Sequence, residues 1–327
     1  MKHLRDFIKE SLRILENMEF SKIPLNEGGH VFGEGSDPIK KEYIKSTIDH
    51  FIKDFTSIFP AVKGHFENPQ TLGSVGKKDV SGDIDLAIDE NCLKNIEDWG
   101  LDKEYVDRLF AKFKKRARTA TDEGLMRRAV IVSIAEKINA KDGNIKCSDK
   151  SSGNGVLFCE YPQFDGNNEL DLTVQIDINF GDVDWLKFAY YSDSYSGNVK
   201  GLHRTQLMLH LFDYKGHQFN HNQGVKNKES GEWVAKNPKE AINKLNELYH
   251  FNIDEKTLQN YNKLQEFLHK HLSEKDLEGV YDIYLKTLDH TRCDIPEDLQ
   301  EYWIKNRERL GLTGKFLPND SRLKSII

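Results

Sequence analysis

Acidic residues alternate with apolar ones in the segment DIDLAID, residues 83–89. Because successive side chains of a β-strand point to opposite faces, Asp83, Asp85 and Asp89 would share one face and the apolar residues the other. Carboxylates at positions i and i+2 lie about 7 Å apart at the Cα level, so their oxygens can converge on cations placed between them. Hard oxygen ligands without soft ligands nearby favour Mg²⁺ or Mn²⁺ over zinc. The segment therefore predicts a metal-binding strand.

A glycine-containing turn precedes this strand in the segment TLGSVGKK, residues 71–78. Glycine lets the backbone approach a ligand closely, and the N–H groups of a turn at Gly73 and Ser74 could bind phosphate oxygens. Ser74 adds a hydroxyl donor, while Lys77 and Lys78 add positive charge. A phosphate-binding turn beside a pair of metal-binding carboxylates is what a nucleoside triphosphate requires, so these residues predict a nucleotide site.

The string LGS, followed after a gap by DIDL, resembles the signature of the DNA polymerase β-type nucleotidyltransferase superfamily. That superfamily includes tRNA CCA-adding enzymes, poly(A) polymerases, antibiotic nucleotidyltransferases and cyclic-oligonucleotide synthases. The resemblance covers residues 66–90 and 170–180. It implies a third carboxylate on a later strand, for which the segment VQIDINF offers Asp177.

The resemblance also implies a role for each of these residues. Asp83 and Asp85 would hold two divalent cations, Mg²⁺ or Mn²⁺, and Asp177 would hold the catalytic one and orient or deprotonate the acceptor hydroxyl. Gly73 and Ser74 would bind the β- and γ-phosphates of a nucleoside triphosphate, with ATP or CTP as the expected donor. The C-terminal half would clamp the base and select the acceptor.

The strand ELDLTVQIDINF, residues 169–180, offers two acids for the third position. Asp171 and Asp177 would share a face, yet six residues separate them by about 20 Å along a strand. Two cations in such a site lie only about 4 Å apart, so one acid must be a bystander. Asp177 is the better choice because it lies deep in an apolar run, where a charge without a partner is costly. Asp171 follows a polar turn, where solvent can satisfy it.

Further basic residues are weaker candidates. Lys200, His203 and Arg204 could grip the triphosphate or the acceptor, or they could be loop residues and a helix cap. The basic run over residues 112–118, with the arginine pair at 127–128, could follow a nucleic-acid backbone. Such a run is more often the solvated face of a helix, so both interpretations stay open.

Composition limits the class of protein. The chain has 327 residues, of which 38% are hydrophobic and 31% charged, and its net charge is −6. No apolar run approaches the roughly 20 residues of a membrane span, and the N-terminus lacks the apolar core of a signal peptide. Four scattered cysteines without a C-x-x-C pair indicate free thiols in a reducing cytoplasm. We therefore expect a cytoplasmic protein without a membrane partner, while its oligomeric state stays open.

Hydrophobic periodicity predicts an α+β fold. We expect a nucleotidyltransferase-type mixed β-sheet core with flanking helices over residues 1–235, and a mainly α-helical domain over residues 236–327. The predicted helices cover residues 1–20, 39–59, 102–118, 123–139, 185–190 and 201–212, and most of the chain after Pro238. The predicted strands cover residues 62–72, 83–89, 155–161 and 169–180, with further strand and turn character over residues 216–236.

These residues together predict a metal-dependent nucleotidyltransferase that moves a nucleoside monophosphate from a triphosphate to an acceptor hydroxyl. An RNA end, tRNA-like, is the first choice of acceptor because of the basic run and the resemblance to CCA-adding and poly(A) enzymes. Transfer to a small molecule or a protein suits the acidic charge better, and cyclic-oligonucleotide synthesis is a third alternative. A non-enzymatic alternative is a nucleotide-binding antitoxin or decoy, which would not need to keep three acids.

Overall fold

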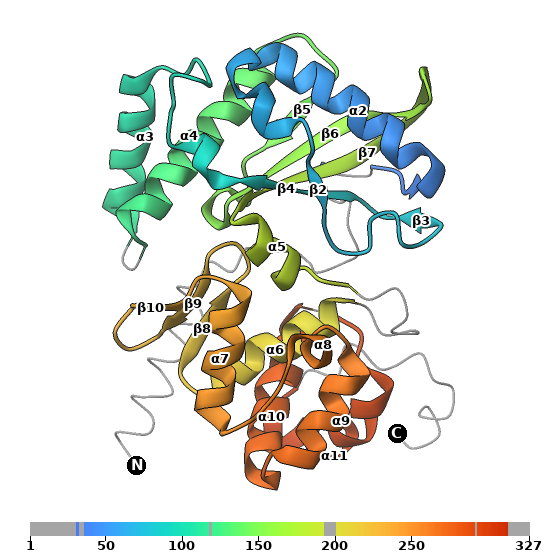
Figure 1. Cartoon of the computed structure of the whole chain (residues 1–327), viewed down its shortest axis with the longest axis vertical. Coiled ribbons are helices and arrows are strands. Elements are labelled where there is room, and N and C mark those ends of the chain that lie inside the picture. Colours follow the sequence, from blue (N-terminus) through green and yellow to red (C-terminus); the bar gives the residue numbers. More distant parts are fainter. Residues whose placement is uncertain (1–30, 33–35, 118–119, 193–200, 292, 313–327) are drawn as a thin grey trace.

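The structure, a computed structural model, describes residues 31–32, 36–117, 120–192, 201–291 and 293–312. Lys200, Arg118 and the helix expected over residues 1–20 lie outside these ranges. The described chain is a mixed α+β protein, in which a sheet with its helices is stacked on a largely helical half (Figure 1). Helix α5 lies between the two (Figure 1).

A five-stranded sheet carries the first half, with the strand order β2-β4-β7-β6-β5. Strands β4 and β7 are parallel, and every other neighbouring pair in this sheet is antiparallel. A separate two-stranded ladder joins β1 to β3. The bounds are β1 Ile39–Lys40, β2 Gln70–Thr71, β3 Val80–Ser81, β4 Ile84–Asp89, β5 Lys146–Ser148, β6 Val156–Asp165 and β7 Asn168–Gly181.

Helices and one aromatic cluster form the core against this sheet. Helix α2 packs on β6 and α4 packs on β5, while α3 packs on α4. Trp99 is 1% exposed, its ring meets Phe55 and Phe59 edge to face, and its indole N–H donates to the Cys92 carbonyl at 2.7 Å. The bounds are α2 Lys41–Ile58, α3 Lys103–Arg116, α4 Asp122–Asn139, and the 3₁₀ turns η1 Pro60–Phe66, η2 Glu90–Leu93 and η3 Ser152–Asn154.

The second half has its own apolar core, which runs from Trp185 to Trp303. Its hairpin strands follow the order β10-β9-β8. The first core ends at Phe180, so the division between cores falls well before residue 235, where the sequence placed a domain boundary. The bounds are α5 Val183–Ala189, α6 Gly201–Tyr214, β8 His217–Asn220, β9 Gly224–Asn227, β10 Trp233–Ala235, α7 Pro238–Tyr249, α8 Glu255–Leu258, α9 Tyr261–His271, α10 Glu274–Thr291, η4 Glu297–Leu299 and α11 Gln300–Leu310.

Most elements were predicted from periodicity, and one prediction was wrong. Helices expected over residues 102–118 and 123–139 are α3 and α4, and the two long strands are β6 and β7. The strand expected over residues 62–72 is instead η1 followed by the two-residue β2. Pro60 at the first turn suits a helical start, and Val62 and Phe66 are both buried at a spacing of one helical turn. Within the described residues, no helix has the length and apolar character needed to cross a membrane.

His210 of α6 gives a first prediction, for stability. Its side chain is 3% exposed, neither ring nitrogen has a hydrogen-bond partner, and burial with the charge of Lys228 lowers the imidazole pKa from 6.5 to about 3. The unfolded chain binds this proton at a higher pH than the folded one, so stability should fall as the pH drops from 6.5 towards 3. His210→Leu should raise the free energy of unfolding at neutral pH by about 1–3 kcal/mol.

Urea denaturation of the wild-type protein and of His210→Leu, at neutral pH and at a pH between 3 and 6.5, measures these effects. The wild-type protein should weaken more than the variant at the lower pH. A variant less stable than wild type at neutral pH would mean that the imidazole contributes favourable contacts to the core.

Candidate functional site

The parallel pairing of β4 with β7 brings two of the predicted acids together. In this register Asp85 lies directly opposite Asp177. Asp83 comes just before β4 begins, and its charge acts on both of the other carboxyls. Asp177 is 8% exposed, whereas Asp171 lies on the exposed first half of β7. The three predicted acids therefore lie together, and Asp171 lies apart from them.

The surroundings of these carboxyls disfavour their charged form. Burial, followed by the charge of Asp83, raises the pKa of Asp85 from 3.8 to about 8, while a hydrogen bond from Asn179 opposes the shift. Burial, followed by the charges of Asp85 and Asp83, raises the pKa of Asp177 well above its usual range. A nearby positive charge, such as a bound cation, would stabilise the ionised form of these buried carboxyls.

Two amides on the same face of β7 hold the acid side chains. Gln175 donates its Nε2 to Asp177 Oδ1 at 2.8 Å, and Asn179 donates its Nδ2 to Asp85 Oδ1 at 3.3 Å. The backbone N–H of Val31 in turn donates to Gln175 Oε1 at 3.3 Å. The alternation of β7 brings both amides to the face of Asp177, which explains why they reach the acids.

The glycine-serine turn lies directly against Asp85. Gly73 has a left-handed backbone with φ +61°, and a Cβ placed on it would lie 3.6 Å from Asp85 Oδ2. The N–H of Leu72 donates to the Asp85 carbonyl at 2.9 Å, and Val75, 7% exposed, anchors the turn in the core. The positive φ, rather than lack of space, is why glycine is favoured at this position. The turn and the acids thus form one site.

A cavity of about 800 Å³ opens beside this turn, between the sheet half and the helical half. Gly73 and Lys77 line it from the turn, and Phe188 and Tyr191 line it from the end of α5. Lys77 donates to the Ser192 carbonyl at 2.7 Å and lies 5.1 Å from the centre of the Tyr191 ring. Further lining residues from the helical half and α5 include Lys187, Asn237, Lys239, Asn243, Glu255 and Gln259.

The other basic candidates occupy different places. Lys78 is exposed in the turn beyond Lys77. His203 is 4% exposed and pairs through Nδ1 with the Tyr284 hydroxyl at 2.7 Å. Arg204 is 2% exposed and donates to carbonyls at the ends of α5 and α8, including Phe188 O at 2.8 Å. It lies against the cavity-lining rings of Phe188 and Tyr191, so it supports the wall, and direct contact of His203 or Arg204 with a phosphate stays a prediction.

The basic run on α3 is only partly available to a partner. Lys112, Lys115 and Arg116 are exposed, while Lys114 pairs with Asp122 at 2.7 Å. Arg127 is 7% exposed and pairs with Glu90 at 2.9 Å, and Arg128 lies 4.4 Å from the centre of the Phe113 ring. Those last two arginines serve the packing of the sheet half.

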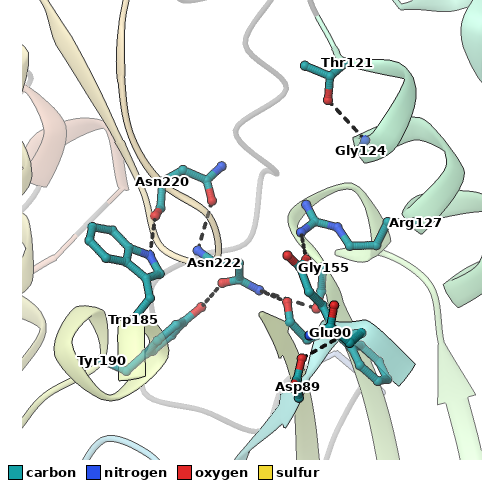
Figure 2. A network of polar contacts seen from close by, with 12 residues as sticks. Asp89, Glu90, Thr121, Gly124, Arg127, Gly155, Trp185, Tyr190, Asn220 and Asn222 are labelled. Atoms are coloured by element: carbon teal, nitrogen blue, oxygen red, sulfur yellow. Dashed lines mark hydrogen bonds and ion pairs between the residues drawn. The ribbon is translucent and has the colours of Figure 1, made fainter. Parts of the chain in front are cut away.

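A polar network joins the residue after α5 and the sheet half to the hairpin of the second half (Figure 2). The Tyr190 hydroxyl donates to Asn222 Oδ1 at 3.1 Å, and Asn222 Nδ2 reaches the carbonyls of Gly155 and Phe180 at 3.4 and 3.5 Å. Burial and the charges of Asp85 and Asp177 raise the pKa of Tyr190, and a Cβ placed on Gly73 would lie 4.0 Å from the Tyr190 carbonyl oxygen and 3.6 Å from Asp85 Oδ2. Asn222, 2% exposed, therefore connects the two halves next to the acid cluster.

The chemistry of the site fits a divalent cation, although its side chains are not arranged around one. Across the parts of the chain that the structure describes, no group of three or more His, Cys, Asp or Glu side chains is placed to hold a metal ion. The side-chain donors of the three acids are oxygens only, and burial together with mutual repulsion raises the pKa of the Asp85 and Asp177 carboxyls. Gln175 and Asn179 hold the Oδ1 atoms of Asp177 and Asp85, so a cation would bind through the Oδ2 atoms of these carboxylates or displace the amides.

Sequence reasoning missed several contributors to this site. Gln175 and Asn179 share the face of Asp177 by strand alternation, so their position was predictable, but their hydrogen bonds to the acids were not. Tyr190 and Asn222 come from a helix end and a hairpin turn, and no local pattern reports that they meet. The cavity forms where the halves join, so no single segment indicates it.

The pKa shifts predict how stability depends on pH when no divalent cation is present. The unfolded chain should ionise Asp85 near pH 3.8 and the folded chain only near pH 8, so stability should be lost as the pH rises through this window. Asp85→Asn should remove much of this loss and raise the Tm at the upper end, because the amide carries no charge. Asp171→Asn, on the exposed part of β7, is the matched control and should follow wild type.

Melting curves in EDTA across this window measure the effect. Adding Mg²⁺ or Mn²⁺ should restore stability to wild type at the upper end and not to Asp85→Asn. If the Tm of Asp85→Asn falls as much as that of wild type over this pH window, ionisation of Asp85 is not what destabilises the folded protein.

The Tyr190–Asn222 contact predicts coupling between the halves. Asn222→Ala removes the partner of the Tyr190 hydroxyl and a donor to the Phe180 and Gly155 carbonyls, although Gly155 O keeps its bond from the Phe180 N–H, and should lower the free energy of unfolding by about 1–3 kcal/mol. Tyr190→Phe removes only the hydroxyl and should cost less. A double-mutant cycle in urea should give an interaction energy of at least about 0.5 kcal/mol. Strict additivity of the two substitutions would mean that the bond contributes nothing to the junction.

The chain thus brings three carboxyls, a glycine turn and a cavity together from segments far apart in the sequence. A function for this site has to be argued from its geometry and charge. No model of a known protein family matches the chain, and no curated protein matches it.

Proposed function

We propose that the chain is a metal-dependent nucleotidyltransferase, which transfers a nucleoside monophosphate from a nucleoside triphosphate to an acceptor hydroxyl. The sheet half would be the nucleotidyltransferase core, and the helical half would close the other side of the nucleotide site. The observation that carries the proposal is the register of β4 and β7, which sets Asp85 opposite Asp177 while Gly73 lies against Asp85.

The position of the turn supports triphosphate binding. Gly73 lines the cavity and also lies next to Asp85, whereas the three acids themselves are not among the lining residues, so a triphosphate in the cavity would have to reach them past this glycine. Because Gly73 has no Cβ, it can adopt this left-handed backbone, and it places no side chain between the ligand and the turn. Lys77, Lys187 and Lys239 line the same cavity together with the acids Asp184 and Glu255, and the lysines would offset part of the negative charge of the phosphates. A cavity of about 800 Å³ is in the size range of sites for nucleotide-sized ligands.

The acids would divide the remaining work. Asp83, Asp85 and Asp177 would hold one or two divalent cations, Mg²⁺ or Mn²⁺, which when bound neutralise phosphate charge and activate the acceptor hydroxyl. A carboxylate oxygen of Asp177 would accept the proton of that hydroxyl once a bound cation favours the charged form of the carboxyl. Gln175 would keep this carboxylate oriented through Oδ1 until a ligand replaces the amide.

The proposed acceptor is an RNA end. Its support is the exposed basic side chains of α3, namely Lys112, Lys115 and Arg116, which could contact a phosphate backbone. The net charge of −6 would keep such binding local and sensitive to salt. A small-molecule or protein hydroxyl is the outcome that the same assay would reveal if RNA is not the acceptor.

The decisive experiment supplies each α-labelled nucleoside triphosphate with Mg²⁺ or Mn²⁺ and total RNA. Label should enter RNA, with ATP or CTP preferred, and Asp177→Asn should lower the rate by at least about 100-fold because it removes charge stabilisation at the reacting centre. Asp171→Asn on the same strand is the control and should keep its activity.

The outcomes separate the parts of the proposal. Label in protein or in a small product would retain the transferase and reject the RNA acceptor. Intact triphosphate with every acceptor would reject the enzyme and favour a binding protein. A reversal of the two aspartate variants would mean that the wrong acid of β7 has been assigned to the site.

A further inference from the structure

Two buried cysteines face each other on neighbouring strands of the sheet. Cys147 of β5 lies directly opposite Cys159 of β6, and their Sγ atoms are 3.2 Å apart. None of the four cysteines of the chain forms a disulfide. The sequence indicated scattered cysteines, and the antiparallel pairing of β5 with β6 is what brings these two together.

The backbone at Cys147 shows which kind of cross-strand pair this is. Its N–H donates to Asn139 Oδ1 and its carbonyl accepts from Asn139 Nδ2, both at 2.8 Å. Both groups therefore point away from β6 and towards α4, so Cys147 and Cys159 form a non-hydrogen-bonded antiparallel pair. The Cα atoms of such a pair are about 4.5 Å apart, within the separation that a disulfide spans.

The position of β5 gives this pair a route to solvent. β5 is an edge strand of three residues, and Cys147 on it keeps 8% of its exposure whereas Cys159 keeps none. Short edge elements open locally at a lower free energy than the centre of a sheet. Cys147 is therefore the thiol that a small reagent meets first, with Cys159 directly behind it.

We propose that Cys147 and Cys159 are a reversible oxidation site, which closes a disulfide when the protein meets a hydroperoxide. The Cys147 sulfur, after losing its proton, attacks the O–O bond, takes up a hydroxyl as a sulfenic acid and releases an alcohol, or water from hydrogen peroxide. The Cys159 sulfur loses its proton and attacks the Cys147 sulfur, and water leaves. Two thiols are oxidised by two electrons while the peroxide is reduced.

The location of the pair determines the speed and the effect of the reaction. Burial, the bond to Cys147 and the charge of Asp177 all raise the pKa of the Cys159 thiol, so the second step is slow at neutral pH. The pair packs in the core with Ile176, the partner of Cys159 on β7, on the sheet face opposite the acids. The disulfide would therefore fasten the edge strand without entering the acid cluster, and the inference does not depend on the proposed transferase activity.

Peptide mapping of the native full chain tests this site. The protein is treated with hydrogen peroxide, remaining thiols are alkylated in denaturant, and trypsin is added. Cleavage after residues 146, 150 and 187 places the two cysteines on separate peptides, 147–150 and 151–187. We expect these peptides to be linked, with a mass lower by two hydrogen atoms, and to separate after dithiothreitol. The oxidised protein should melt at least about 3 °C higher than the reduced one.

Two variants make the assignment specific. Cys147→Ser should prevent the link, and Cys293→Ala, which removes a cysteine of similar burial in the helical half, should leave it intact. Because the linked peptide is measured on wild-type protein, the test does not depend on either variant folding. Alkylation of both Cys147 and Cys159 after prolonged peroxide treatment, oxidation of Cys147 to a sulfinic acid without a link, or a link between other cysteines would each overturn the proposal.

Discussion

The parallel contact between β4 and β7 is the constraint on which the site depends. It sets Asp85 beside Asp177, and like charges at this distance repel each other unless protons, donors or a cation offset them. The sheet supplies donors from the same face through Gln175 and Asn179. The apolar packing on the other face fixes the strands, so the carboxyls cannot relax by moving apart. The site is thus a strained arrangement that the core of the first half holds in place.

Helix α5 connects the acid site in the sheet half to the second half of the chain. Its Leu186, fully buried, packs on Leu72 and Ala87 in a small cluster separate from both main cores. The same helix carries Phe188 to the cavity wall and ends at Tyr190, where the bond to Asn222 begins. The glycine turn, the acid-bearing strand and the cavity wall therefore all pack against the same short helix, α5. A displacement of α5 would change all three at once.

The sequence predicted the longer strands β4, β6 and β7, the alternation of their faces, and the position of Asp177 rather than Asp171 beside the first two acids, because each depends on local periodicity. It also placed Gln175 and Asn179 on the correct face. It could not predict that Tyr190 meets Asn222 or that a cavity lies beside Gly73, because these depend on how two halves pack. The prediction of a strand before Leu72 was wrong because an apolar run with a proline at its start suits a helical turn as well as a strand. From the sequence, His203 and Arg204 were expected either to contact the triphosphate or the acceptor, or to be loop or helix-cap residues. The packing of α6 instead buries both side chains.

The parallel pairing also sets the order in which the site can form. A parallel connection cannot close by a tight hairpin, and here residues 90–167, with α3, α4, β5 and β6, lie between the two acid-bearing strands. A growing chain that has left the ribosome only as far as α4 already contains Asp83, Asp85 and the glycine turn. It does not yet contain β7, the strand with which β4 pairs. Non-local pairing of this kind is slow because much of the chain must be ordered first. Any cation or triphosphate that requires all three acids would bind only after β7 has docked, so its binding would report that the sheet of the first half has formed.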